Sequence, residues 1–165
     1  EANVRIQATA NPKGDHFVGK SLSIFKEQIP FESALLSRFH LVFVIRRPGV
    51  DETVSIARQI ATDSAPKKRR KEDLEYIQGY IDHAMSVDVT FDKNLEPMIT
   101  SFIEEAKRDE EKYVVEIGPR TVHGVIRIAQ ALARSQLREK TTQDDVERAL
   151  EIMKESFKIE GIIRP

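Results

Sequence analysis

Cysteine is absent from the 165-residue sequence. Its absence excludes disulfide bonds and thiolate metal ligands, and it is compatible with a cytoplasmic protein. No apolar run approaches the roughly 18 residues that a membrane-spanning helix needs, and no signal peptide is recognisable, so we expect no membrane partner. The four histidines lack the spacing of metal ligands, and no metal site is predicted. They are His16, His40, His83 and His123.

An excess of charge of either sign is absent as well. The sequence has 26 Lys and Arg against 27 Asp and Glu, so the overall charge does not indicate a nucleic-acid partner. The basic run KKRRK (67–71) lacks interleaved aromatic residues, and a solvated linker is the favoured interpretation over a phosphate-binding segment. Apolar residues make up 40% of the chain, which is typical of a globular protein. Because the first residue is Glu, we expect a processed chain or a part of a longer one.

Two stretches in the first 50 residues have strand character. Residues 3–12 alternate apolar and polar side chains up to Asn11-Pro12, where the proline ends the pattern. Residues 41–45, LVFVI, are continuously apolar, as in a strand buried on both faces of a parallel sheet. Between them, residues 13–29 favour a long loop, and Pro30 favours a short helix after it. Two strands do not make a stable sheet, so residues 1–50 are predicted to end a larger α/β domain.

The rest of the chain, residues 51–165, is predicted to be helical. Helices are expected at about 51–61, 72–85, 92–108, 118–137 and 141–157. The expected boundary residues are Asp51 as an N-cap, Pro97 and Pro119 in first turns, and Thr142 with Asp145 in a capping box. The side chains expected to pack inward are Val54, Ile56, Ala57, Ile60, Leu74, Ile77, Tyr80, Ile81, Leu95, Met98, Ile99, Phe102 and Ile103. The fold class is therefore mostly α with a partial α/β piece.

Three polar residues stand at positions that favour a site. Asn11 follows a predicted strand, where an amide can orient a water or contact a phosphate, although from position alone ordinary Asn-Pro turn chemistry is the favoured alternative. Arg120 lies in the first turn of a predicted helix, where a cation opposes the helix dipole unless an anion docks there. A solvated arginine is the equally weighted alternative.

Arg38 lies between a helix-like and a strand-like stretch in ALLSRFHLVFVI (34–45). That junction would hold its guanidinium rigidly at the rim of the domain, within reach of a nucleotide on a neighbouring subunit. From its position alone, a surface salt bridge is the favoured alternative.

These residues resemble the minichromosome maintenance (MCM) helicases of the AAA+ ATPases over nearly the whole chain. ATANP (8–12) resembles the end of the sensor-1 strand, and IPFESALLSRFHLVFVI (29–45) resembles the arginine-finger segment. Residues 119–153 are similar in length and pattern to the sensor-2 helix and the helix after it. The resemblance implies that Asn11 is the sensor-1 residue, Arg38 the arginine finger and Arg120 the sensor-2 arginine.

The sequence departs from the family pattern in two ways. His40 stands where the family usually has Asp, which changes the expected local salt bridges. A phosphate loop of the form G-x-x-x-x-G-K-[ST] is missing, as is an apolar strand ending in paired acids for Mg²⁺. The resemblance therefore implies the C-terminal half of the ATPase module, with the end of the AAA+ core at 1–50 and the helical lid at 51–165.

The function implied by the resemblance is ATP-driven DNA unwinding in replication, by a hexameric ring of the parent protein. ATP and Mg²⁺ would be bound mainly by residues outside this chain. Asn11 would orient the attacking water, and Arg38 and Arg120 would stabilise charge on the γ-phosphate from a neighbouring subunit. The implied location is the cytoplasm or nucleus, or the nucleoid of a prokaryote. The alternatives are the lid of another AAA+ ATPase (chelatase-like, transcription-activating or protease-linked) and a non-hydrolysing interaction module.

We predict that the 165-residue chain alone does not hydrolyse ATP, because the phosphate loop and the Mg²⁺ carboxylates supply most of the nucleotide binding. Its affinity for ATP is expected to be weaker than millimolar. A steady-state ATPase assay on the purified chain checks this expectation. Turnover that co-elutes with the protein would contradict it.

Overall fold

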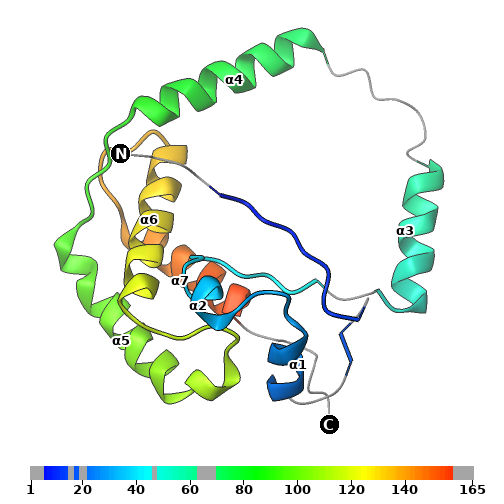
Figure 1. Cartoon of the computed structure of the whole chain (residues 1–165). Helices are drawn as coiled ribbons and strands as arrows, with labels where there is room; N and C mark the ends of the chain where they lie inside the picture. The colour runs from blue at the N-terminus through cyan, green and yellow to red at the C-terminus, as the bar shows by residue number, and fades with distance from the viewer. Residues whose placement is uncertain (1–5, 15–16, 19–21, 46–47, 63–69, 158–165) are drawn as a thin grey trace.

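The computed structural model describes residues 6–14, 17–18, 22–45, 48–62 and 70–157. The described part is mostly helical, and no helix in it is both long and apolar enough to cross a membrane. Figure 1 shows α5, α6 and α7 gathered together with α1 and α2 beside them, whereas α3 stands apart. The elements are α1 (Leu22–Gln28), α2 (Ser33–Leu36), α3 (Val50–Thr62), α4 (Lys71–Ser86), η1 (Lys93–Leu95), α5 (Glu96–Arg108), η2 (Glu110–Lys112), α6 (Pro119–Ser135) and α7 (Gln143–Phe157).

The core lies between α5, α6 and α7, and the contact between α6 and α7 is the most extensive. Small side chains on the facing surfaces, such as Ala129 and Ala149, let the two helices approach closely, and both residues are fully buried. The α5 prediction is confirmed, because Pro97 lies in the first turn and Ile99 and Phe102 are buried. The further core residues are Phe25, Ile29, Leu36, Ala106, Val114, Val115, Ile117, Val125, Val146 and Met153.

Neither expected strand is formed by the described residues of 3–12 and 41–45. In the part of the chain that the structure describes, a β-bridge outside the helices joins Thr90 and Lys140. A strand needs a neighbour for its N–H and C=O groups, and two isolated segments supply too few. At Val42 the side chain of Ser156 in α7 provides the hydrogen-bond partner for the backbone instead. The Val42 N–H donates to Ser156 Oγ at 2.7 Å, and the Ser156 hydroxyl faces Val42 O at 3.3 Å.

The prediction of a loop over residues 13–29 was wrong for residues 22–28, which form the helix α1. The ring of Phe25 is buried in this helix and stacks on Phe17, with 4.2 Å between the ring centroids. The side chain of Gln28 then closes the preceding loop, since it accepts from Val18 N at 2.7 Å and donates to Val18 O at 2.6 Å. The two contacts join residues 8 and 10 positions apart across a loop, and the periodicity of the sequence did not indicate them.

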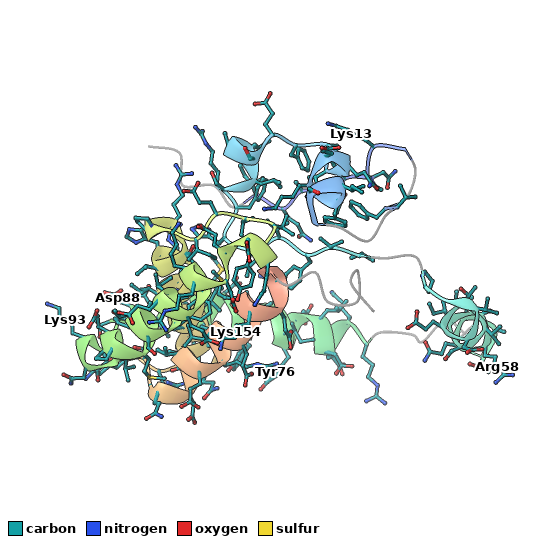
Figure 2. All side chains as sticks on the ribbon, turned by 90° about the horizontal axis from the view of Figure 1, so that it is seen from below. Lys13, Arg58, Tyr76, Asp88, Lys93 and Lys154 are labelled. Atoms are coloured by element: carbon teal, nitrogen blue, oxygen red, sulfur yellow. The ribbon has the colours of Figure 1, made fainter. Side chains whose placement is uncertain are left out.

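The structure corrects the predicted start and packing of α3. The helix begins at Val50, so Asp51 lies inside the first turn and is not the N-cap. Gly49 flanks the helix instead, and its N–H donates to Glu52 Oε2 at 3.0 Å. None of the apolar side chains of α3 is buried, and Figure 2 shows the helix, marked by Arg58, away from the main body.

The apolar face predicted for α4 is also exposed in this structure, although the helix itself is confirmed. Its side chains Leu74, Ile77, Tyr80 and Ile81 remain 41–52% accessible. The helix approaches α6 at its C-terminal part, where Ala84 is buried and the Tyr80 hydroxyl donates to Ser135 O at 2.6 Å. Amphipathic spacing predicts a face that requires a partner, and the described residues do not supply one along most of α4.

The turn between α6 and α7 is fixed by Asp145, which is 3% exposed. Arg138 donates to both carboxylate oxygens at 2.7 Å, and the Thr142 N–H donates to Oδ2 at 2.8 Å, the side-chain-to-N-cap half of the predicted capping box. The hydrogen bond from Arg138 is the main reason that the pKa of Asp145 falls to about 2, with help from Thr142 and against the effect of burial. The charge-assisted pair thus holds the end of α6 on the start of α7.

We predict that Met153→Ala destabilises the chain by about 2–5 kcal/mol, because its fully buried side chain fills the space between α6 and α7. Met85→Ala is the matched control, since Met85 is more than half exposed and should change the free energy of unfolding by about 0.5 kcal/mol or less. Urea unfolding followed by circular dichroism measures both. Equal losses for the two methionines would contradict the packing described above.

The Asp145 pair predicts a dependence of stability on pH. The folded pKa of about 2 lies below the unfolded value of about 3.9, so the contribution of about 2–3 kcal/mol is present above pH 4 and is lost as the pH falls toward 2. Asp145→Asn should therefore be less stable than the parent chain at pH 6, and the gap should narrow toward pH 2.

Asp144→Asn serves as the control for this pH dependence, because Asp144 is exposed and lies one residue from Asp145. Thermal unfolding across the pH range gives the comparison. A gap between Asp145→Asn and the parent chain that stays constant with pH would show that the carboxylate charge is not the cause.

Candidate functional site

The start of α6 forms a fixed edge of the candidate site. Pro119 occupies the first position of the helix, as predicted, and Gly118 is the N-cap with extended backbone angles. The Thr121 N–H donates to Gly118 O at 2.9 Å, and the Gly118 N–H donates to Thr121 Oγ1 at 3.2 Å. Thr121 is buried, so the first turn of α6 is held in place from the inside.

Arg120 projects from this first turn toward the segment that precedes Arg38. Its Nη1 donates to Ser37 O at 3.3 Å and lies 3.5 Å from Ser37 Oγ. Ser37 is the residue before Arg38, so the structure brings two predicted site residues, 82 positions apart in the sequence, to the same edge of the molecule. Both arginines have exposed side chains, and among the described residues neither forms an ion pair with a carboxylate.

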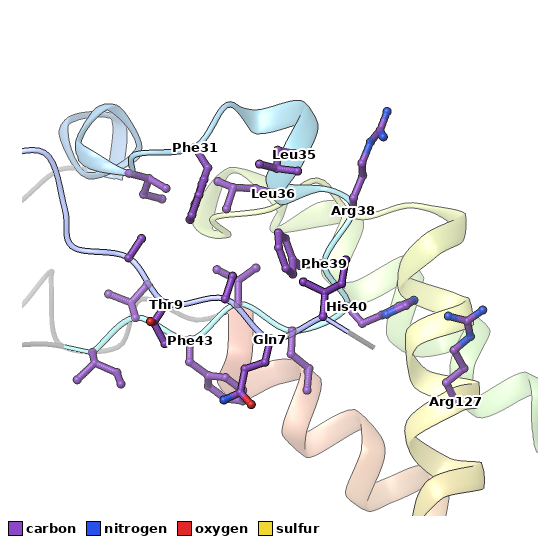
Figure 3. A pocket seen from close by; sticks show the side chains of 18 of the residues that line it. Gln7, Thr9, Phe31, Leu35, Leu36, Arg38, Phe39, His40, Phe43 and Arg127 are labelled. Carbon is purple, nitrogen blue, oxygen red and sulfur yellow. The ribbon is translucent and has the colours of Figure 1, made fainter. Parts of the chain in front are cut away.

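Asn11 lies on a different wall of the same region. It is exposed and lines an open hollow of about 2320 Å³, whose walls include the segments 6–12 and 35–45 and the second half of α6. Arg38 also lines this hollow, yet Figure 3 shows its side chain pointing away from Arg127 and toward solvent. Within the described part of the chain, no hydrogen bond joins Asn11 to Arg38 or Arg120. Arg38 and Arg120 are thus linked through Ser37, whereas Asn11 shares only the lining of the hollow with Arg38.

His40 packs against α6 two residues after Arg38. A Cβ atom built on Gly124 would lie 3.3 Å from His40 Cδ2 and 3.4 Å from Met153 Cε, so the glycine provides the space for the imidazole ring. Burial is the main cause that lowers the pKa of His40, and the charges of Arg127 and His123 add to it. Figure 3 shows the side chains of His40 and Arg127 directed toward one another.

Gly124 is a functional candidate that the sequence reasoning missed. A glycine inside a helix costs about 1 kcal/mol relative to alanine, so its presence in α6 indicates a packing requirement. That signal was available in the sequence, but the partner was not, because His40 lies 84 positions away. The sequence identified His40 only as a departure from a family pattern.

The chemical capacity of this edge is the binding of an anion. Two guanidinium groups that form no ion pair with a described carboxylate lie near the start of α6, an arrangement that suits phosphate oxygens. The described residues contain no cluster of three or more His, Asp or Glu that could hold a metal ion. Mg²⁺ is therefore not assigned to any of these residues.

Comparison with known proteins gives one family match and several relatives. The family model of the MCM AAA-lid domain matches residues 75–157. A Minichromosome maintenance protein MCM of Saccharolobus solfataricus is 25% identical over 158 residues, which cover 93% of this chain and 23% of that protein. The DNA helicase MCM8 of Xenopus laevis is 27% identical over 203 residues, covering 94% of this chain and 24% of that protein.

A third relative, the DNA replication licensing factor mcm7 of Schizosaccharomyces pombe, is 29% identical over 164 residues, covering 92% of this chain and 21% of that protein. The chain thus spans less than a quarter of the length of these curated relatives.

Proposed function

Because the chain belongs to the MCM family, whose AAA-lid model matches half of it, we propose that it is part of an ATP-driven DNA helicase that acts in replication. The names of the relatives, a DNA helicase and a DNA replication licensing factor, support this function. The observation that carries the proposal is the contact between Arg120 and Ser37, which puts two arginines that form no ion pair with a described carboxylate at one edge of the molecule.

The proposed role of Arg38 and Arg120 is to stabilise the negative charge that spreads over the γ-phosphate oxygens during hydrolysis. Phosphoryl transfer depends mainly on positioning and charge neutralisation, and planar guanidinium groups can donate to two phosphate oxygens at once. Asn11 is proposed to orient the attacking water. It would do so at the nucleotide of its own subunit, whereas Arg38 of the same chain would act on the nucleotide of a neighbouring subunit. That separation fits a site at a subunit interface, with Asn11 on one subunit and Arg38 on the next.

The two parts of the chain are proposed to belong to two structural units of the parent. Residues 1–50 would complete an AAA+ core, in which the segments 6–12 and 41–45 pair with strands of the same core. Residues 51–165 would form the lid. The exposed apolar faces of α3 and α4 support this division, because they are surfaces that a packed core would cover.

The proposed partners are further copies of the parent in a hexameric ring and the DNA within it, in the nucleus or the cytoplasm. ATP is the proposed substrate, with Mg²⁺ held by residues other than those described here. A second candidate function, a non-hydrolysing interaction module, is favoured by the same exposed faces of α3 and α4. The lid of a different AAA+ ATPase is less favoured, because the family model that matches is the MCM lid.

We predict that Arg38→Ala in the parent protein leaves ATP binding nearly intact and lowers turnover by about 10³–10⁵-fold, since an arginine finger acts on a nucleotide bound by another subunit. Lysine at this position should not restore turnover, because it lacks the planar fork. The decisive measurement mixes Arg38→Ala subunits with subunits that lack a functional phosphate loop, each inactive alone. A finger that acts in trans predicts partial recovery of turnover in the mixture.

Arg148→Ala is the matched control for a surface arginine, because Arg148 forms an exposed ion pair with Glu151 at 2.7 Å. Its loss should leave turnover unchanged and change stability by about 1 kcal/mol or less. If Arg38→Ala rings assemble and hydrolyse ATP as the Arg148→Ala rings do, Arg38 has only a surface role.

A further inference from the structure

The segment that carries Arg38 is attached to the helices α6 and α7 on both sides of the arginine. Before it, Ser37 accepts the hydrogen bond from Arg120 at 3.3 Å. After it, the His40 ring lies on Gly124, and the backbone of Val42 is bound to Ser156 of α7. Within six residues the segment thus meets the two helices three times.

We propose that His40, seated on Gly124, is a positioning residue that fixes Arg38 relative to α6, so that Arg38 and Arg120 reach one phosphate-bearing ligand as a single rigid unit. The proposal rests on the proposed function for the identity of that ligand. The contact between His40 and Gly124 itself stands on the structure alone, and it can be tested without any nucleotide.

His40 is the central attachment because the other two cannot hold Arg38 by themselves. The hydrogen bond from Arg120 is long, and the Arg120 side chain is exposed to water. Ser156 binds Val42, four residues beyond Arg38. The His40 ring lies between these two points and packs on a helix backbone, which does not yield as a flexible side chain does.

The fit depends on the absence of a side chain at position 124. A Cβ atom at 3.3 Å from His40 Cδ2 is tighter than ordinary packing, and Met153 Cε limits the space from α7 at 3.4 Å. Alanine at position 124 would require a small shift of the His40 ring, and leucine would displace the ring from α6. Gly79 in α4 offers a matched position, because a Cβ atom there would meet nothing within 4 Å.

Burial, together with the nearby positive charges, favours the neutral form of His40 and lowers its pKa. Arg127 and His123 face it from α6, Arg120 and Glu116 line the small space beside it, and α7 contributes the uncharged Met153. Protonation would place a positive imidazole beside Arg127 and His123. The lowered pKa of His40 means that the docked state is favoured above pH 6.5 and weakens as the pH falls below that value.

The first test uses the 165-residue chain and nuclear magnetic resonance. We expect a nuclear Overhauser effect between His40 Hδ2 and Gly124 Hα at pH 7.5, and its weakening as the pH falls below 6.5. Gly124→Leu should remove it and shift the amide resonances of Ser37 and Arg38, whereas Gly79→Leu should do neither. If the effect is missing in the parent chain, or if the Arg38 resonance is unchanged in Gly124→Leu, the proposal is overturned.

The second test measures ATP hydrolysis by the parent protein. Gly124→Leu should lower kcat by about tenfold or more without raising KM for ATP, since the binding residues lie on another subunit, and Gly79→Leu should leave both constants unchanged. His40→Phe, which refills the space but carries no charge, should keep more of kcat than His40→Ala. The kcat of the parent is expected to fall below pH 6.5, and that of His40→Phe is not. If Gly124→Leu does not fold, Gly124→Ala gives the same comparison with a smaller loss.

A normal kcat in a folded Gly124→Leu variant would overturn the positioning role. If the parent shows no ATP hydrolysis at all, the proposed function fails, while the resonance experiment still decides whether His40 fixes Arg38 to α6.

Discussion

The packing of α6 on α7 is the contact on which the other features depend. Val125, Ala129 and Ala133 on one helix and Val146, Ala149 and Met153 on the other are all inaccessible to water. These residues fix the distance and rotation of α6, and the direction of its outer face follows from them. That outer face carries the exposed Arg120 and Arg127, so the positions of both arginines are set by buried side chains of the same helix.

The arginines of the structure fall into two groups with different surroundings. Arg138 has both its carboxylate partner and a structural purpose, because Asp145 accepts two hydrogen bonds from it at the turn between α6 and α7. Arg38 and Arg120 have no such carboxylate among the described residues, although acids are as numerous as bases in the sequence. A chain with this many acids has the means to neutralise a surface arginine. Other described arginines, such as Arg127 and Arg134, also form no ion pair. The feature that favours an anion is therefore the proximity of Arg38 and Arg120 through Ser37.

The sequence predicted the parts of the fold whose signals are local. Pro97 and Pro119 indicate helix starts through their own backbone geometry. Thr142 and Asp145 indicate the start of α7 through a hydrogen bond between residues three positions apart. Sequence reasoning failed where a structure depends on a distant partner, as in the two unformed strands and the buried position of Phe25 in α1. The packing of His40 on Gly124 could not be predicted for the same reason, because nothing in the sequence indicates that these two residues are in contact.

The unformed strands and the exposed faces of α3 and α4 have a common physical cause. The run LVFVI has the composition of a strand covered on both faces, and the apolar side chains of α3 and α4 have the spacing of packed helices, yet Phe43, Ile45 and most of these helix side chains remain exposed in the described structure. The segment 37–42 differs, since it is already attached to α6 and α7. Partner strands that pair with residues 41–45 would therefore be joined to α6 through His40 and to α7 through Ser156. A movement of that sheet would then reach Arg38 and Arg120 together, which is the mechanical consequence of seating a histidine on a glycine in the middle of a helix.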